Sequence, residues 1–151
     1  VMHLPGHTLG HVAYYTENKL GELWLLCGDT LFGAGCGRLF EGTPEQMHRS
    51  LKRLAALDGN TQVYCSHEYT LRNIEFALSL EPSNPELQKR KLDTQALRDQ
   101  GMASLPSSIE LERATNPFLR CHVAGIQLSS GLRPADEVAV FTRIRELRNV
   151  Y

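Results

Sequence analysis

Residues 22–70 read ELWLLCGDTLFGAGCGRLFEGTPEQMHRSLKRLAALDGNTQVYCSHEYT and contain two strand-like segments and two helix starts. The apolar run 22–27 stops at a Gly-Asp pair and predicts a strand, and 61–65 predicts a second one. A Thr-Pro-Glu-Gln sequence supplies an N-cap, a helical Pro and a capping-box Gln, so a helix is expected over 43–57. Thr70 can cap a further helix. Strands that alternate with helices in this way are typical of an α/β fold.

The flanking segments extend this pattern. Residues 11–16 are rich in β-forming side chains, and the turn-like stretch 18–21 predicts an antiparallel hairpin with the strand at 22–27. Residues 85–100 predict a helix with few apolar positions, which therefore lies largely in water. Residues 134–151 carry an apolar stripe and predict a final helix.

The composition excludes several classes of protein. Of 151 residues, 42% are hydrophobic and 22% are charged, so the chain is too apolar to be disordered. The 16 Lys and Arg balance 17 Asp and Glu, and the net charge of −1 argues against a nucleic-acid or membrane partner. The longest apolar run, 23–27, is too short to cross a membrane. The four cysteines are widely spaced and no secretory signal is visible, so we expect reduced thiols and a cytoplasmic location.

Two histidines and one aspartate occupy similar positions in this pattern. His7 lies in a Pro-Gly-His-Thr loop, Asp29 follows one predicted strand, and His67 follows the other. Catalytic and binding groups of α/β proteins gather at strand ends, because the scaffold is rigid there while a side chain still reaches a cleft. Two imidazoles and a carboxylate suit zinc or iron, although Asp29 could also simply open a turn through its side-chain oxygen.

Two further features allow more than one interpretation. Residues 31–42 hold four glycines and are expected to lack regular structure. Cys36 within them could be an exposed nucleophile, but we favour the alternative that the glycines allow tight packing near a site. Arg145 and Arg148 are neighbours on a predicted helix, where they could grip a carboxylate or form a solvated helix end.

Five short motifs follow one another along the chain: Leu-Pro-Gly-His-Thr-Leu-Gly-His at 4–11, Cys-Gly-Asp-Thr-Leu-Phe at 27–32, Gly-Cys-Gly-Arg-Leu-Phe-Glu-Gly at 35–42, Tyr-Cys-Ser-His-Glu-Tyr-Thr at 64–70 and Asn-Pro-Phe-Leu-Arg at 116–120. In this order and spacing they closely resemble the glyoxalase II family, the hydroxyacylglutathione hydrolases of the metallo-β-lactamase superfamily. The resemblance covers essentially the whole chain.

The resemblance implies an α/β fold in two parts. Residues 1–80 would form the second half of a metallo-β-lactamase-like αββα sandwich, and residues 81–151 a mainly helical, glutathione-binding C-terminal domain. The H-x-H-x-D-H motif of the family is absent from these 151 residues. We therefore expect a C-terminal portion of such an enzyme. Its partner would be the missing N-terminal half of the same domain, or a second copy associating through the exposed sheet face.

The same resemblance implies two divalent metal ions, with zinc as the first candidate and iron or manganese as alternatives. His7 matches a ligand of one metal, His67 a ligand of the other, and Asp29 the carboxylate that bridges both. Asp29 would thereby be catalytic, through the metal-bound hydroxide. His11 either orients one of these ligands or hydrogen-bonds the backbone. With half of the ligands missing, we expect little or no hydrolysis from this chain alone.

The implied reaction is hydrolysis of the thioester S-D-lactoylglutathione to D-lactate and glutathione. Family positions that hold the glutathione moiety fall on Arg38, Phe40, Tyr69, Arg145 and Arg148, and the last two suit the glycyl carboxylate. Two alternatives stay open. One is a relative of the glutathione persulfide dioxygenases with a single iron, and the other is a glutathione-binding chain without catalysis.

Overall fold

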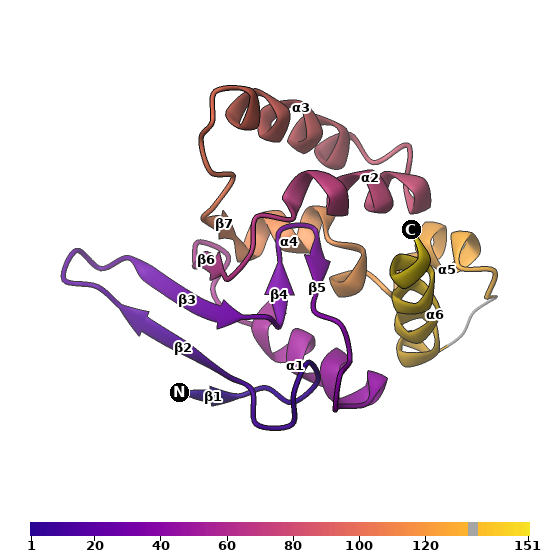
Figure 1. Cartoon of the computed structure of the whole chain (residues 1–151), viewed down its shortest axis with the longest axis horizontal. Coiled ribbons are helices and arrows are strands. Elements are labelled where there is room, and N and C mark those ends of the chain that lie inside the picture. The colour runs from indigo at the N-terminus through magenta and orange to yellow at the C-terminus, as the bar shows by residue number, and fades with distance from the viewer. Residues whose placement is uncertain (133–135) are drawn as a thin grey trace.

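The computed structural model describes residues 1–132 and 136–151, which form a mixed α/β structure (Figure 1). The strands are β1 (Met2–His3), β2 (Val12–Glu17), β3 (Leu23–Gly28), β4 (Leu31–Phe32), β5 (Gly35–Cys36), β6 (Gln62–Cys65) and β7 (Ser107–Ser108). The helices are α1 (Pro44–Ala55), α2 (Thr70–Leu80), α3 (Pro85–Asp99), α4 (Ile109–Thr115), the 3-10 turn η1 (Pro117–Leu119), α5 (Ala124–Ser129) and α6 (Glu137–Val150). The α/β class predicted from the sequence is confirmed.

Five of the strands form one mixed sheet in the order β1-β2-β3-β6-β7, while β4 and β5 pair separately. β2 and β3 are antiparallel, with Tyr14 opposite Leu26, which confirms the predicted hairpin. β3 and β6 are parallel neighbours, with Leu26 opposite Tyr64, and α1 lies in the crossover between them. Because parallel neighbours end at the same edge of a sheet, the residues that follow β3 and β6 lie close together.

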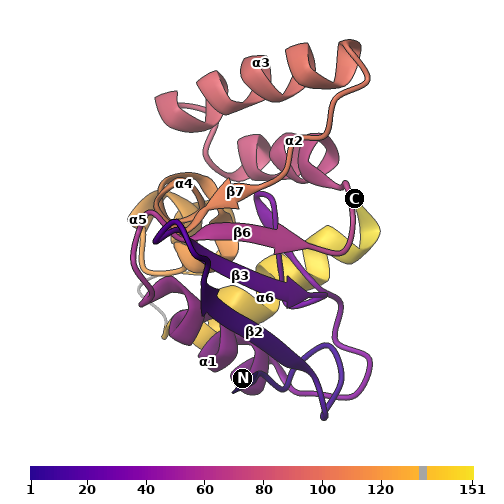
Figure 2. The same ribbon diagram turned by 90° about the vertical axis from the view of Figure 1, so that its left-hand side faces the viewer.

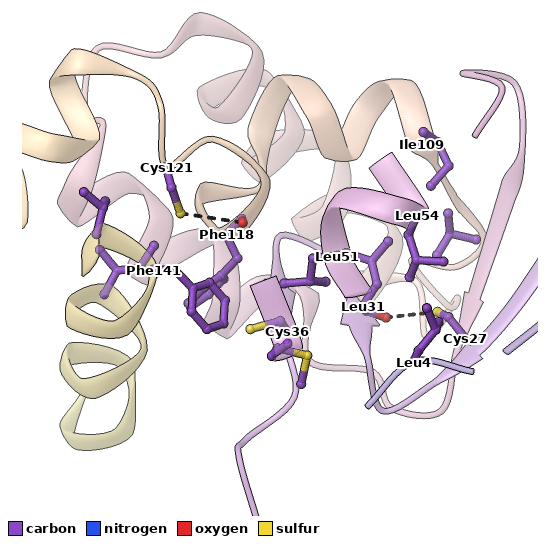
Figure 3. Packing of buried hydrophobic residues seen from close by; sticks show 14 of the residues in the cluster. Leu4, Cys27, Leu31, Cys36, Leu51, Leu54, Ile109, Phe118, Cys121 and Phe141 are labelled. Carbon is purple, nitrogen blue, oxygen red and sulfur yellow. Dashed lines mark hydrogen bonds between the residues drawn. The ribbon is translucent and has the colours of Figure 1, made fainter. Parts of the chain in front are cut away.

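α1 begins at the capping residues that the sequence indicates. The Thr43 hydroxyl accepts a hydrogen bond from the Gln46 backbone N–H, and the Gln46 side chain accepts one from the Thr43 N–H. Met47, Leu51 and Leu54 share one face of the helix and are fully buried. They join a core cluster with apolar side chains of β3, β4, β5, η1 and α6 (Figure 3). The core therefore lies between the sheet, α1 and the C-terminal helices.

The sheet has one buried and one exposed face, and in Figure 2 β2, β3 and β6 lie in front of α1 and α6. Ala13 and Leu25 point into the core and are fully buried. On the opposite face Val12, Tyr14 and Leu26 are 37%, 55% and 45% exposed. Adjacent large apolar side chains on a strand face are typical of a contact surface. What covers this face stays a prediction.

The glycine-rich stretch 31–42 is more ordered than the sequence predicts. Leu31–Phe32 and Gly35–Cys36 pair as an antiparallel hairpin, and both strands are buried. The prediction of no regular structure was wrong for this part, because the glycines allow close packing: a side chain at Gly33 would collide with Thr70 of α2. These glycines bring the hairpin against a helix instead of loosening it.

The C-terminal segments follow the prediction in outline. α3 presents few apolar side chains, as expected, yet it buries the guanidinium of Arg90. α6 confirms the final helix, although its predicted start at residue 134 lies outside the described residues. No helix that the structure describes is long and apolar enough to span a membrane. The core cluster draws side chains from both sides of residue 81, and the division into two domains stays a prediction.

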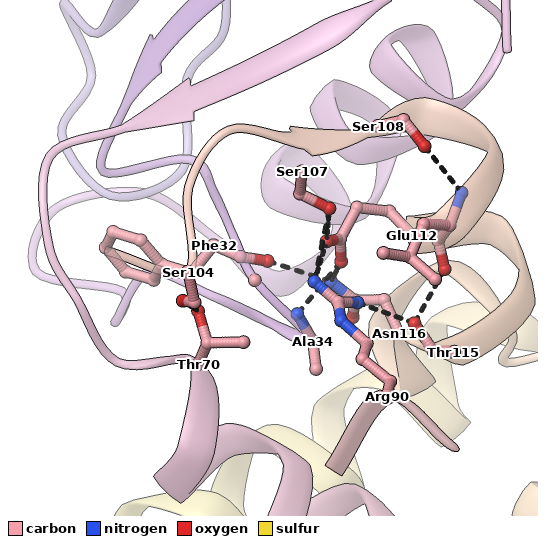
Figure 4. Close-up of polar contacts among 12 residues, drawn as sticks. Phe32, Ala34, Thr70, Arg90, Ser104, Ser107, Ser108, Glu112, Thr115 and Asn116 are labelled. Atoms are coloured by element: carbon pink, nitrogen blue, oxygen red, sulfur yellow. Dashed lines mark hydrogen bonds and ion pairs between the residues drawn. The ribbon is translucent and has the colours of Figure 1, made fainter. Parts of the chain in front are cut away.

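A buried polar network connects α3, α4 and the β4–β5 hairpin (Figure 4). Glu112 is fully buried, and its Oε1 accepts hydrogen bonds from Arg90 Nη2 (2.6 Å) and Ser107 Oγ (2.5 Å). Its Oε2 accepts from the Ala34 backbone N–H and from Asn116 Nδ2, both at 2.9 Å. Both carboxylate oxygens are therefore satisfied, as a buried charge requires. The network fixes the hairpin that leads directly into the functional site.

Candidate metal and anion site

Three side chains from separate parts of the chain meet at the end of the sheet. His7 lies in the loop between β1 and β2, Asp29 directly follows β3, and His67 follows β6. The Nε2 atom of His7 is 3.6 Å from Asp29 Oδ2, and the Nε2 atom of His67 is 3.3 Å from Asp29 Oδ1. The structure thus brings together the three residues that the strand-end pattern predicts as metal ligands.

The polar contacts of His7 and Asp29 indicate a need for positive charge between them. His7 Nδ1 is 2.9 Å from the carbonyl oxygen of Arg38, which can only accept, so Nδ1 carries the proton. In a neutral ring Nε2 then presents a lone pair to a carboxylate oxygen, which is unfavourable unless a cation lies between the two. Two ligands of one tetrahedral zinc ion lie about 3.4 Å apart, given zinc–ligand distances of about 2.0–2.1 Å. The two nitrogen–oxygen separations fit that spacing.

The donor set nevertheless does not close into a complete site. Across residues 1–132 and 136–151, no group of three or more His, Cys, Asp or Glu side chains is gathered tightly enough to hold a metal ion. His7, Asp29 and His67 thus offer suitable donors in pairs. They require further ligands for full coordination.

Ser66 is a site residue that the sequence analysis missed. Its hydroxyl donates a hydrogen bond of 2.6 Å to Asp29 Oδ1, the oxygen that also faces His67. The Ser66 backbone N–H donates to the Gly28 carbonyl, one residue before Asp29. Ser66 therefore restricts the rotation of the carboxylate. Ser66 lies in the sequence between Cys65, the last residue of β6, and the candidate ligand His67, and this position could have indicated it as a site residue.

His11 makes the backbone contact that was one of its two predicted roles. Its Nε2 is 3.1 Å from the carbonyl oxygen of Cys27, two residues before Asp29. Its ring also lies edge-on to the His7 ring, with 5.9 Å between the centroids. The hydrogen bond holds the end of β3, whereas an influence of His11 on metal affinity stays a prediction.

A cavity of 450 Å³ opens beside Asp29 and extends along the hairpin toward α2 and α6. Its lining includes all the residues predicted to hold metal or substrate, namely His7, Asp29, Arg38, Phe40, His67, Tyr69, Arg145 and Arg148. It also includes Phe32, Arg72 and Asn73, which the sequence analysis missed. Arg72 follows Tyr69 by three residues, and this helical spacing is the signal that could have revealed it. Metal-type donors and cationic side chains therefore share one concave surface.

Aromatic rings flank the two histidines. The rings of Tyr69 and His67 stack with a centroid separation of 4.9 Å and an interplanar angle of 17°. Phe40 packs on His7 with 4.9 Å between the centroids, and Phe32 meets Tyr69 edge-on. These contacts restrict the imidazole orientations. Tyr69 and Phe40 are themselves 48% and 69% exposed, so they can also contact a ligand.

The two arginines of α6 are held in different ways. Arg145 is buried, and its Nη1 donates to the Cys36 carbonyl (2.8 Å) while its guanidinium lies over the Phe118 ring. The Arg145 Nε is buried without a hydrogen-bond partner among the described residues. Arg148 donates from Nε and Nη2 to Asn73 Oδ1 at 3.4 and 3.2 Å. Neither side chain forms a freely solvated helix end, since both line the cavity.

The thiols are not arranged as nucleophiles. Burial raises the pKa of the Cys36 thiol despite the neighbouring Arg145, and burial raises the pKa of Cys27 to about 12. Burial also raises the pKa of Cys121, and it is the main cause of the raised pKa of the partly exposed Cys65. The structure therefore supports packing as the role of the turn around Cys36.

We expect native-state alkylation to discriminate among these thiols. Near pH 8, iodoacetamide should modify Cys65 first and the buried Cys27, Cys36 and Cys121 at least about tenfold more slowly, because access and thiolate fraction are both low there. Peptide mass spectrometry after short labelling gives the order. Labelling of all four in urea is the control, and fast native modification of Cys36 would contradict its buried position.

Gly37 packs directly on the backbone of Asp29. A side chain at this position would collide with the Asp29 carbonyl oxygen and also approach His7 Nδ1. The variant Gly37→Ala should therefore lose about 1–3 kcal/mol of unfolding free energy in urea denaturation. Gly10→Ala is the matched control, since nothing lies within 4 Å of its added side chain. Equal stability of the two variants would show that the contact is not present in solution.

The fold and the sequence of this chain have counterparts among known proteins. The structure matches a crystal structure of a metallo-beta-lactamase from Staphylococcus aureus with a TM-score of 0.52 and 18% identity, over 97% of this chain and 37% of that one. The fold is therefore similar to part of the metallo-β-lactamase fold. Residues 68–151 match the family model described as "Hydroxyacylglutathione hydrolase C-terminus". The chain belongs to the hydroxyacylglutathione hydrolase family.

Curated relatives agree with this assignment. A protein from Methylobacillus flagellatus named "Hydroxyacylglutathione hydrolase" is 61% identical over 99% of this chain and 58% of its own length. Relatives of the same name from Dechloromonas aromatica and a Nostoc species are 48% and 50% identical over 100% of this chain and 62% and 59% of theirs. The chain thus spans about three fifths of the length of these relatives.

Proposed function

We propose that this chain forms the C-terminal part of a hydroxyacylglutathione hydrolase, which converts S-D-lactoylglutathione and water into D-lactate and glutathione in the cytoplasm. The observation that carries the proposal is the single cavity that joins a His–Asp–His donor set to a group of arginines. A glutathione thioester needs both features, because it has a reacting carbonyl at one end of its cysteinyl side chain and carboxylates at the ends of its peptide. The names of the family and of the relatives support the same reaction.

In this proposal His7, Asp29 and His67 hold two divalent metal ions together with ligands from outside residues 1–151. Zinc is the first candidate, with iron or manganese as alternatives, since nitrogen and carboxylate donors suit all three. When bound, such a metal pair lowers the pKa of water toward neutrality and polarises a carbonyl. Ser66 holds the carboxylate of Asp29 in the orientation in which each oxygen faces one histidine.

The remaining cavity residues position the glutathione moiety. Arg145 and Arg148 are three residues apart on α6 and offer guanidinium groups to the glycyl carboxylate. Arg38, Phe40 and Tyr69 line the same cavity and would contact the peptide. Phe40 has no hydroxyl, so it contributes packing alone. Binding at the carboxylates orients the thioester carbonyl toward Asp29, since a fixed peptide restricts where its cysteinyl sulfur can lie.

The test combines three measurements on the purified 151-residue chain: metal content, titration with glutathione and thioester hydrolysis. We expect glutathione binding together with little or no hydrolysis, because the described donors do not complete a metal site. Two tightly bound metals with sustained turnover would contradict the need for ligands outside the chain. Absence of glutathione binding by the folded chain would contradict the proposed substrate. A mass measurement in solution would show whether a second copy covers the exposed face of Val12, Tyr14 and Leu26.

A further inference from the structure

Arg72 lies in the first turn of α2 and lines the same cavity as Tyr69 and Arg148. Its neighbour Asn73 is buried and accepts two hydrogen bonds from the Arg148 guanidinium, at 3.4 and 3.2 Å. This contact joins α2 to α6 at the wall of the cavity. It therefore holds residue 72 beside the arginine pair that we assign to the glycyl carboxylate.

The charges around the cavity are unbalanced. Four arginines line it, whereas Asp29 is the one carboxylate among the described lining residues. Asp29 faces His7, His67 and Ser66, so its charge is already engaged. The arginines of the cavity consequently have no other carboxylate beside them among the described lining residues.

The arginines repel one another at short range. Burial lowers the pKa of Arg148, and the charges of Arg145, Arg72 and Arg38 lower it further in that order. Arg145 donates a hydrogen bond from Nη1 to the Cys36 carbonyl, and Arg148 donates two hydrogen bonds to Asn73 Oδ1. Arg72 is exposed and makes no ion pair within the described part of the chain. A bound anion would relieve this repulsion, and Arg72 has its donors available to pair with it.

We propose that Arg72 is a third guanidinium for the glycyl carboxylate and that it increases the preference of this site for glutathione compounds in which that carboxylate is free. This inference rests on the proposed function and adds a specificity-determining residue to it. The side chain reaches the ligand from α2, opposite the pair on α6, so that the carboxylate lies between two helices. Arg72 also follows the exposed ring of Tyr69 by one helical turn, which places both on the ligand side of α2.

Isothermal titration of the 151-residue chain with glutathione tests the proposal. Arg72→Gln should raise Kd about tenfold, because a charge-assisted hydrogen bond to an exposed carboxylate contributes about 1.4 kcal/mol. Arg49→Gln is the matched control: it removes the same charge from an exposed position on α1 outside the cavity, and it should change Kd by less than about twofold. Circular dichroism of all variants confirms that each remains folded.

A second ligand tests whether Arg72 binds the glycyl carboxylate. Glutathione esterified at its glycine carboxylate should bind the unaltered chain more weakly, and with this ligand Arg72→Gln should have no additional effect. An equal loss with both ligands would overturn the assignment to the glycyl carboxylate. Equal affinities of Arg72→Gln and Arg49→Gln for glutathione would overturn the role of Arg72 while leaving the proposed function intact. Failure of the unaltered, folded chain to bind glutathione would overturn the proposed function and this inference with it.

Discussion

Replacing Arg90 by Met is expected to lower the free energy of unfolding by about 3–5 kcal/mol, because it leaves a fully buried carboxylate without its counter-charge. Glu112 is 0% exposed and Arg90 is 5% exposed, and their ion pair is 2.6 Å long. The remaining partners of Glu112 are neutral hydrogen-bond donors. They cannot replace a guanidinium, so the carboxylate must take up a proton or the structure must open to water.

Urea denaturation measures this change, and Lys89→Met is the matched control. Lys89 precedes Arg90 on α3 and forms an exposed pair with Asp93 at 2.8 Å, so its loss should cost less than about 0.5 kcal/mol. Arg90→Lys keeps the charge and should give an intermediate loss, which provides a measurement if Arg90→Met does not fold. Combining Arg90→Met with Glu112→Gln should recover part of the stability. Equal denaturation midpoints for Arg90→Met and Lys89→Met would show that the buried pair contributes nothing.

The Arg90–Glu112 pair also marks a limit of prediction from the sequence. The hairpin of β2 and β3 and the capped helix α1 are predicted correctly, since alternation and capping are encoded within a few residues. The sequence of α3 predicts a solvent-exposed helix, because its polar residues leave no apolar stripe. Only tertiary packing brings Arg90 against the carboxylate of Glu112, 22 residues away. The same holds for the β4–β5 hairpin, whose order depends on contacts with α2 and Glu112 that its glycines allow.

The residues of the candidate site also differ in whether the sequence predicts them. His7, Asp29 and His67 could be predicted to meet, because strand ends converge by geometry alone. The part played by Ser66 and Arg72 depends on how side chains turn after the strands and helices have packed. Arg145 could be placed on a helix face, but its burial against Phe118 follows from the position of α6 over the hairpin. Local sequence thus predicts which elements carry the site, and packing decides which atoms face the ligand.

Asp29→Asn is expected to weaken zinc binding by this chain about 100-fold, the upper end of the 10–100-fold loss typical of residues that only support a metal ligand. Asp29 is the residue that faces both histidines, one with each oxygen, so its charge serves both candidate ligands. An amide keeps the shape of the side chain but removes that charge. Ser66→Ala removes only the 2.6 Å hydrogen bond to Oδ1 and should therefore weaken binding by about tenfold.

Zinc titration followed through the imidazole proton signals gives a residue-specific measurement. In the unaltered chain the signals of His7 and His67 should both shift, and in Asp29→Asn the same shifts should need about 100-fold more zinc. Asp58→Asn is the control: Asp58 is exposed and accepts a turn hydrogen bond from the Asn60 N–H, which an amide oxygen can also accept. Unchanged zinc affinity in Asp29→Asn, or shifts confined to other histidines, would contradict the assignment of these three residues. A displaced titration of both signals in Asp29→Asn, with an unchanged titration in Asp58→Asn, is the result expected if the Asp29 carboxylate serves both imidazoles.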